Sequence, residues 1–179
     1  MKKIILTVFA ASSLLLYSTQ AFALVNFSVG VPLSHTITGK YSDGTEIKSE
    51  GVSGTFIQVG VPMLPGIGMD SYKTKLESDA PFELETMIYN LYYLLPIPII
   101  NLTLGVGTGS TTFKCSGCDA YFDKGSASQW YASFGMPIIP LFDLHLSYRS
   151  VSSKIKTKSG SIEHDLGGNV MGLGIGFNF

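Results

Sequence analysis

Large apolar side chains alternate with small or polar ones along the last nine residues of the chain. The apolar positions are Met171, Leu173, Ile175, Phe177 and Phe179, and the positions between them are Gly172, Gly174, Gly176 and Asn178. Because successive side chains of a β-strand point to opposite faces, this period predicts a strand with one apolar face and one face of glycine and amide. Such a strand suits a wall between lipid and a crowded interior.

The same alternation predicts seven further strands upstream. They lie near residues 26–34, 57–63, 67–76, 83–95, 100–113, 130–136 and 142–149. Asp70, Lys73 and Lys75 interrupt the alternation of the third of these strands. The pattern therefore predicts an all-β fold, an eight-stranded antiparallel up-and-down β-barrel, and the features given below favour a transmembrane one.

The connections between the predicted strands are of two kinds that alternate along the chain. Four are long and polar, near residues 39–52, 76–82, 114–127 and 150–166, and three are short and proline-rich, near residues 61–65, 95–99 and 136–140. In an up-and-down barrel this places the long loops on one rim and the short turns with both termini on the other. The short turns are apolar, and we expect Met63, Leu64, Ile97 and Ile138 to contact either the inner leaflet or a partner.

The first residues predict export from the cytoplasm. Lys2 and Lys3 precede an apolar stretch that ends near Leu16, and small residues surround a cleavage point near Ala23. This pattern is typical of a secretory signal peptide, residues 1–23, followed by one mature domain, residues 24–179. No later segment offers the roughly 20 continuous apolar residues that a membrane-spanning helix needs.

Composition narrows the function class without choosing an activity. Removal of the signal peptide leaves ten basic and thirteen acidic residues, a net charge of −3, and the chain shows no basic patch for nucleic acid. A soluble, periplasmic, lipocalin-like binder would have the same alternation with its apolar face turned inward. Aromatic residues on the apolar face favour the membrane, because such residues form girdles at the lipid interfaces; they are Tyr89, Tyr93, Trp130 and Tyr148.

The terminal strand, the export signal and the loop pattern together resemble the small eight-stranded outer-membrane barrels of Gram-negative bacteria, the group of the OmpA membrane domain, OmpX and OmpW. The resemblance covers the whole mature chain. It implies an outer-membrane location, contact with outer-membrane lipid and lipopolysaccharide, and no cofactor. It also implies that the outer-membrane assembly machinery recognises the chain through Leu173, Ile175, Phe177 and Phe179.

Polar residues on the inward face define a candidate interior site. Strand parity turns Gln58, Asn101, Asp143, His145 and Arg149 inward, together with glycines such as Gly105 and Gly174. One interpretation is a narrow channel for small or apolar solutes, as in OmpW. The other, which we favour, is a paired polar plug that stabilises the barrel, because buried charges persist where they are paired.

A hydrolase is the enzymatic alternative. Some small outer-membrane barrels are lipid A hydrolases with a His-x-Ser pair on the seventh strand, and His145-Leu146-Ser147 followed by Glu163 or Asp165 has the same order. The residues around the pair do not match that family, and His145 falls on the inward face. We therefore predict a protein that is not an enzyme.

Two loops carry further candidate chemistry. Cys115 and Cys118 are expected to form a disulfide in an oxidising compartment, because the loop lacks the additional ligands of a metal site and the fold of a redox protein. Lys154, Lys156 and Lys158 either contact lipopolysaccharide or pair across a hairpin with acidic residues, and the second interpretation is favoured. The predicted function is surface binding, adhesion or envelope integrity through the outer loops.

Overall fold

The computed structural model describes residues 25–40, 44–78, 82–97, 100–115, 117–139, 141–158 and 163–178. The predicted signal peptide and Phe179 lie outside the described residues.

Eight long antiparallel strands form a closed barrel, as predicted. The strands are β1 (Asn26–Ile37), β2 (Ser49–Gly60), β3 (Gly66–Leu76), β4 (Glu83–Ile97), β5 (Ile100–Lys114), β6 (Gly125–Ile139), β7 (Phe142–Lys156) and β9 (Gly168–Asn178). Each strand pairs with the next, and β9 pairs with both β7 and β1, which closes the sheet. A short strand, β8 (Glu163–Asp165), extends the hairpin of β7, and a short helix, α2 (Cys118–Tyr121), follows β5.

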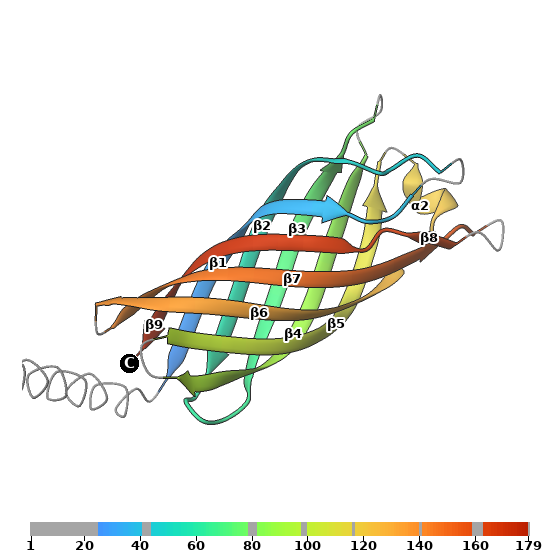
Figure 1. Cartoon of the computed structure of the whole chain (residues 1–179). Coiled ribbons are helices and arrows are strands. Elements are labelled where there is room, and N and C mark those ends of the chain that lie inside the picture. Colours follow the sequence, from blue (N-terminus) through green and yellow to red (C-terminus); the bar gives the residue numbers. More distant parts are fainter. Residues whose placement is uncertain are drawn as a thin grey trace, which may run out of the picture.

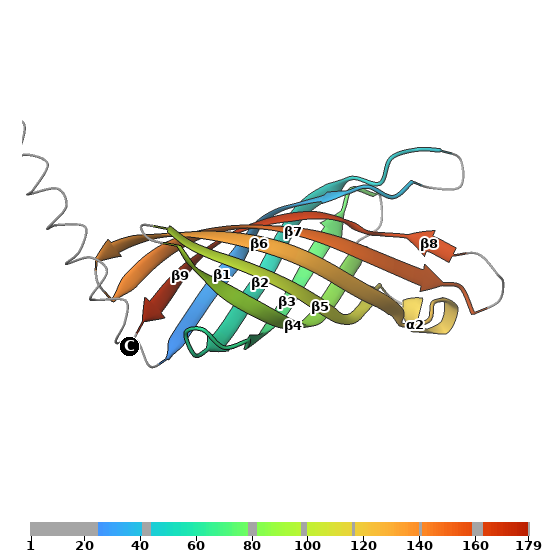
Figure 2. The same cartoon turned by 60° about the horizontal axis from the view of Figure 1, so that its bottom comes forward.

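The two rims of the barrel differ. The start of β1, the end of β9 and the short connections β2–β3, β4–β5 and β6–β7 lie at one rim, here called the turn rim (Figure 1). Both α2 and β8 lie at the opposite rim, here called the loop rim (Figures 1 and 2). The barrel therefore presents short connections on one side and longer hairpins on the other.

Some strand ends differ from the prediction. β2 begins at Ser49, inside the predicted polar connection, and ends at Gly60, so that Val61 and Met63 lie in the turn instead of the strand. β7 continues to Lys156, beyond the predicted start of the last loop. In both extensions the outward side chains are polar and several inward ones are apolar, such as Phe56, Val151 and Ile155, so a search for apolar outward residues misses them.

A β-bulge changes the predicted faces of β1. The register against β9 shifts between Pro32 and Ser34, and Leu33 and Ser34 are both exposed. Ser34, which strict alternation from Phe27 to Leu33 would turn inward, therefore lies outside, while His35 and Ile37 turn inward. An extra residue in one strand has this effect because it reverses the parity of every residue that follows.

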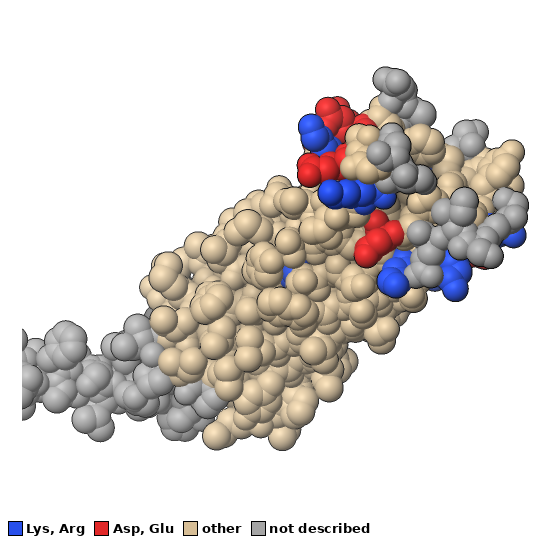
Figure 3. Space-filling view, turned by 45° about the vertical axis from the view of Figure 1, so that its right-hand side comes forward, with Lys and Arg blue, Asp and Glu red and all other residues tan. Residues whose placement is uncertain are grey.

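The outer surface changes character once along every barrel strand. From the turn rim upward the last apolar outward residues are Leu33, Ile57, Met69, Met87, Val106, Trp130, Tyr148 and Met171. The next outward residues are Ser34, Thr55, Ser71, Glu85, Thr108, Ser128, Ser150 and Asn169. The apolar side chains on the turn-rim side of this boundary are called the apolar belt. Figure 3 shows the charged side chains gathered at one end of the molecule, above this belt.

The interior shows the opposite arrangement. Beneath the loop rim, Ile37, Ile47, Leu76, Leu84, Ile155 and Leu166 form a buried apolar cluster, with Phe82, Phe113 and Phe122 packed against it. A second cluster below it contains Phe56, Tyr72, Ile88, Ala127, Val151 and Val170. Polar side chains fill the interior behind the apolar belt. Each strand is thus polar outside and apolar inside near the loop rim, and the reverse near the turn rim.

Candidate functional site

The five predicted interior residues all point into the barrel, but the structure divides them. Gln58, Asp143, His145 and Arg149 are buried, and Asn101 is half-buried. Asn101, Asp143 and His145 share one group near the turn rim. Arg149 belongs to a second group deeper in the barrel. Gln58 lies between them, where its amide donates to the Tyr131 hydroxyl at 2.7 Å and the Ser28 hydroxyl donates to its carbonyl oxygen at 3.2 Å.

Amide groups surround Asp143 at the turn rim. His145 Nε2 lies 2.5 Å from Asp143 Oδ1. The side-chain amides of Asn101 and Asn178 both donate to Asp143 Oδ2, at 2.5 Å and 3.1 Å. The side-chain amide of Asn26 donates in turn to Asn178 Oδ1 at 2.5 Å. These residues come from β1, β5, β7 and β9, so the network ties opposite walls of the barrel together across this end of the interior.

Arg149 is the centre of the second group. Its Nε donates to Asp70 Oδ2 at 3.0 Å, and both side chains are almost completely buried. One further guanidinium nitrogen donates to the Ser147 hydroxyl. The guanidinium carbon lies 3.5 Å from the centre of the Phe56 ring and 5.0 Å from that of Tyr131. A cation held by a carboxylate and two aromatic faces is both paired and stacked, which suits a buried position.

Gln129 links this group to β3 and β4. Its amide nitrogen donates to Asp70 Oδ2 at 2.5 Å and to Asn90 Oδ1 at 2.6 Å. Sequence reasoning missed Asp70, Asn90 and Gln129, although strand parity signals all three. Asp70 alternates with Ile67 and Met69, so the residue that interrupts the third strand is an inward-facing one.

Side chains from neighbouring strands lie close to several of the interior glycines. A Cβ at Gly105 would overlap the ring of Tyr131, and one at Gly107 would overlap the side chain of Asn90. A Cβ at Gly176 would overlap Asp143 and His145. The space that these glycines provide is occupied by large side chains from neighbouring strands. A cavity of about 20 Å³ beside Arg149, lined by residues that include Ser28, Gly30 and Ser147, has room for about one water molecule.

The structure does not bring together the residues of the hydrolase alternative. His145 pairs with Asp143, whereas the Ser147 hydroxyl donates to the backbone oxygen of Gly172 at 3.2 Å and accepts from Arg149. Asp165 and Glu163 lie in β8 at the loop rim, opposite Lys154 and Lys156 of β7. His145 and Ser147 are both buried in the barrel, away from its lipid-facing surface.

Cys115 and Cys118 lie at disulfide distance in the β5–β6 connection, with their Cα atoms 5.1 Å apart. Within the described residues, no group of three or more histidine, cysteine, aspartate or glutamate side chains is placed to hold a metal ion. The described part of the chain also contains no helix with the length and hydropathy needed to cross a membrane.

The lysines of the last hairpin lie beside acidic residues. Lys154 and Lys156 point outward from β7, where the register places them opposite Asp165 and Glu163, and Lys158 follows the strand. Lys73 and Lys114 flank Glu85 on the outer face of β3–β5, with N–O distances of 3.8 Å and 3.5 Å. Cations and anions are thus interleaved above the apolar belt.

The predicted assembly residues lie along β9. Leu173 and Ile175 are exposed in the apolar belt, and Phe177 is half-buried between two aromatic neighbours. The ring centre of Phe177 lies 6.3 Å from that of Phe27 on β1 and 5.0 Å from that of Phe142 on β7. The fourth residue, Phe179, lies outside the described residues.

No protein family model matches the sequence, and no curated protein matches it significantly. Solved structures do match. Neisserial surface protein A is 14% identical over 87% of this chain and 97% of that chain, with a TM-score of 0.63. Outer membrane protein W of E. coli is 11% identical over 88% and 98%, with a TM-score of 0.53, and outer membrane protein AlkL is 14% identical over 88% and 88%, with a TM-score of 0.50. The chain therefore has the fold of the small eight-stranded outer-membrane barrels.

Proposed function

We propose that this protein is an outer-membrane barrel without enzymatic activity that acts at the cell surface, in envelope integrity or in binding and adhesion, through the hairpins of its loop rim. The observation that carries the proposal is the filled interior. The Asp143 group crosses the barrel near the turn rim, the Arg149 group crosses it further in, and two apolar clusters lie beyond. A barrel whose described interior is filled in this way interacts with other molecules through its outer surface and its hairpins.

The outer surface supports the proposed location. Large apolar side chains such as Leu33, Leu91 and Phe134 are about half exposed, and they surround the barrel continuously. A water-soluble protein rarely exposes a patch of this size, whereas a barrel in lipid requires one. The proposal includes export by the signal peptide with cleavage near Ala23, and delivery by the assembly machinery through the aromatic end of β9.

Lipopolysaccharide is the proposed partner of the charged side chains above the apolar belt. Lys154, Lys156 and Lys158 are placed to meet the phosphates of lipopolysaccharide, although their register beside Asp165 and Glu163 equally suits pairing within the hairpin. The Cys115–Cys118 disulfide is proposed to hold the base of the β5–β6 connection. The proposed function requires neither nucleic acid nor a cofactor.

The first test is single-channel conductance of the mature protein, refolded into planar bilayers, with a heat-dependent shift in gel mobility as the check on folding. We expect the folded protein to be electrically silent. A variant with Phe56→Ala and Tyr131→Ala removes both rings that hold Arg149 and is the control that should conduct. Discrete steps from the unmodified protein would overturn the proposal in favour of a narrow channel.

The second test replaces residues 157–162 or 117–124 with glycine and serine of equal length and leaves the barrel strands intact. Intact cells carrying these variants are compared for uptake of a hydrophobic dye and for adhesion. Increased dye uptake or reduced adhesion, without loss of the folded barrel, supports a role of the hairpins. Unchanged uptake and adhesion in both variants would contradict it.

A further inference from the structure

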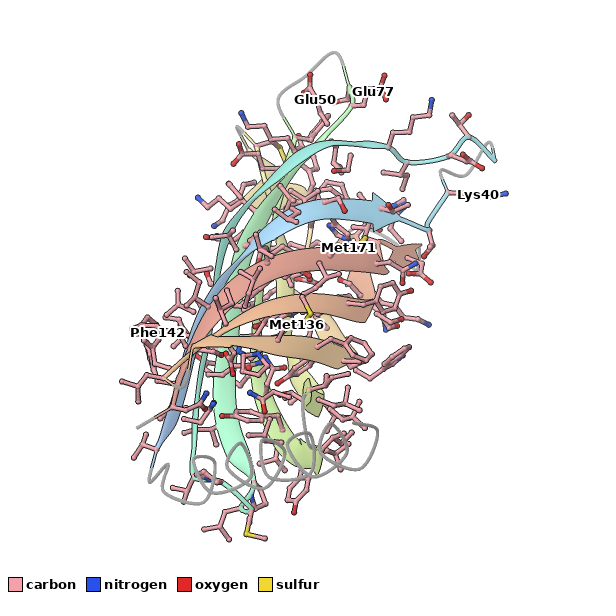
Figure 4. The ribbon with its side chains drawn as sticks, turned by 60° about the vertical axis from the view of Figure 1, so that its left-hand side comes forward. Lys40, Glu50, Glu77, Met136, Phe142 and Met171 are labelled. Atoms are coloured by element: carbon pink, nitrogen blue, oxygen red, sulfur yellow. A yellow bond between two sulfur atoms is a disulfide. The ribbon has the colours of Figure 1, made fainter. Side chains whose placement is uncertain are left out.

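The short connections of the turn rim, with the strand ends beside them, are as apolar as the belt above them. Met63 is 72% exposed, Leu64 58%, Ile138 68% and Leu141 50%. Residues 56–69, 86–97, 100–113 and 125–142 contain no lysine, arginine, aspartate or glutamate. In Figure 4 the labelled Met136 and Phe142 lie toward this end of the barrel, far from the charged Lys40, Glu50 and Glu77. Connections that lie in periplasmic water have no reason to be free of charge.

On most strands the apolar belt is too short for a membrane, whereas on β4 it runs further, from Met87 to Ile97. On β7 it extends from Phe142 to Tyr148 and on β1 from Phe27 to Leu33. At about 3.3 Å per residue each stretch is roughly 20 Å long, and a strand tilt near 40° reduces its height to about 15 Å. The apolar band of an outer-membrane barrel is about 25 Å tall. Roughly 10 Å must therefore be supplied above or below the belt.

The belt cannot be extended toward the loop rim. Above its boundary the outward residues are serine, threonine and charged side chains, and Glu85 lies between Lys73 and Lys114 in an exposed ion-pair cluster. Charged side chains on the lipid face are costly at the bilayer midplane and tolerated only near the interfaces. The missing height therefore has to come from the turn rim.

We infer that the connections of the turn rim and the strand ends beside them are seated in the inner leaflet, at the boundary between the lipid headgroups and the acyl chains. The side chains of Met63, Leu64, Ile138 and Leu141 then lie among the acyl chains. Irregular backbone is excluded from the hydrocarbon centre, so this boundary is as deep as the turns can lie. The bond from Leu64 N to Val61 O, 3.1 Å long, satisfies part of that backbone internally. The partner of this surface is thus phospholipid, continuous with the lipid around the belt.

The Asp143 group, at the same end of the barrel, lies at the level of the headgroups instead of opening into bulk periplasm. Its carboxylate and amides are bonded to one another across the barrel, which suits a site with restricted access to water.

Tryptophan fluorescence measures this depth directly, because Trp130 is the only tryptophan in the chain. In one variant Trp130→Phe is combined with Ile138→Trp, on the turn-rim side of β6, and in the matched control it is combined with Ser126→Trp, on the loop-rim side of the same strand. The vesicles contain phosphatidylcholine brominated near the glycerol end or near the methyl end of the acyl chain. Iodide, present on both sides of the membrane, reports access to water.

We expect Ile138→Trp to lose most of its emission to bromine near the glycerol end and little to iodide, and Ser126→Trp to show the reverse. Strong iodide quenching of Ile138→Trp without bromine quenching would overturn the inference and assign this rim to water or to a periplasmic protein. Leu64→Trp in the same background makes the measurement within a turn, and it also serves if Ile138→Trp does not fold.

The inference rests on the proposed membrane location, and the unmodified protein tests that location separately. Trp130 lies at the upper boundary of the belt and should be quenched by bromine near the glycerol end. If bromine at neither position quenches Trp130, the barrel is not inserted and the proposed location fails. If bromine quenches Trp130 and leaves Ile138→Trp unaffected, only the seating of the turn rim fails.

Discussion

Arg149 is the residue whose environment departs furthest from ordinary solvation. It is 2% exposed, and its partner Asp70, 79 positions earlier in the chain, is fully buried. Removal of one member of a buried pair leaves the other charged and unpaired, whereas removal of both relieves that cost. The free energy of unfolding should therefore fall further when one member of the pair is replaced than the loss of the pair as a whole would require.

We expect Arg149→Met to destabilise the barrel by about 3–5 kcal/mol, because the Asp70 carboxylate then has no cation. The double variant Arg149→Met with Asp70→Asn should lower the free energy of unfolding by clearly less than the sum of the losses in the two single variants. The measurement is urea unfolding in lipid vesicles, followed by Trp130 fluorescence. Additive single effects would show that the two side chains are not coupled.

Strand parity predicted much of this site. It turned Asp143, His145 and Arg149 inward because each alternates with a large apolar residue on β7, and the same rule applied to Asp70 would have added it. Parity could not predict partners. Asp70 and Arg149 meet because β3 and β7 lie on opposite walls of the closed barrel, and neither strand carries local information about the other. Nor could it show that Tyr131 fills the space beside Gly105.

At the scale of the element, each strand passes through two environments. β7 has Leu146 and Tyr148 exposed on its outer face near the turn rim, whereas further along the same strand Ile155 is fully buried and Lys154 and Lys156 are exposed. The half of the strand beyond the belt therefore follows the rule of a water-soluble barrel. Its stability should depend on the apolar cluster beneath the loop rim.

We expect Ile155→Ala to lower the stability of that half of the barrel by about 2–5 kcal/mol, because the substitution removes most of a buried side chain from the cluster. The effect should be local. Amide hydrogen exchange should accelerate in residues 150–156 and 163–166 and stay slow in residues 142–148. Lys156→Ala is the matched exposed control and should change neither region. Uniform acceleration along β7 would contradict the division of the strand into two environments.

At the scale of the whole molecule, closure depends on β9, which pairs with β1 on one side and β7 on the other. Phe177 lies on this seam between Phe27 and Phe142. Aromatic pairs contribute about 0.5–1.5 kcal/mol beyond the area that they bury. The same residue belongs to the proposed assembly signal, so its two roles have to be measured apart.

We expect Phe177→Ala to lower the stability of the refolded barrel by about 1–3 kcal/mol through the loss of both ring contacts. Met171→Ala, further along the same strand, is the control and should cost less. The temperature at which gel mobility shifts measures this closure without cellular machinery. If that temperature is unchanged while the yield of assembled barrel in cells falls, Phe177 acts as a recognition signal and its contacts do not hold the seam.

The amino-acid sequence by itself determined the number of barrel strands and, outside the bulge in β1, which of their faces is apolar. These follow from a period of two, which is set by local backbone geometry and is readable in any one strand. The tertiary structure alone decided how the interior is filled. The contacts of Arg149 with Asp70 and Phe56, the bulge in β1 and the rings beside the glycines depend on which strands become neighbours and in which register. Register and closure are properties of the whole sheet, because one shifted residue reverses the faces of all those that follow.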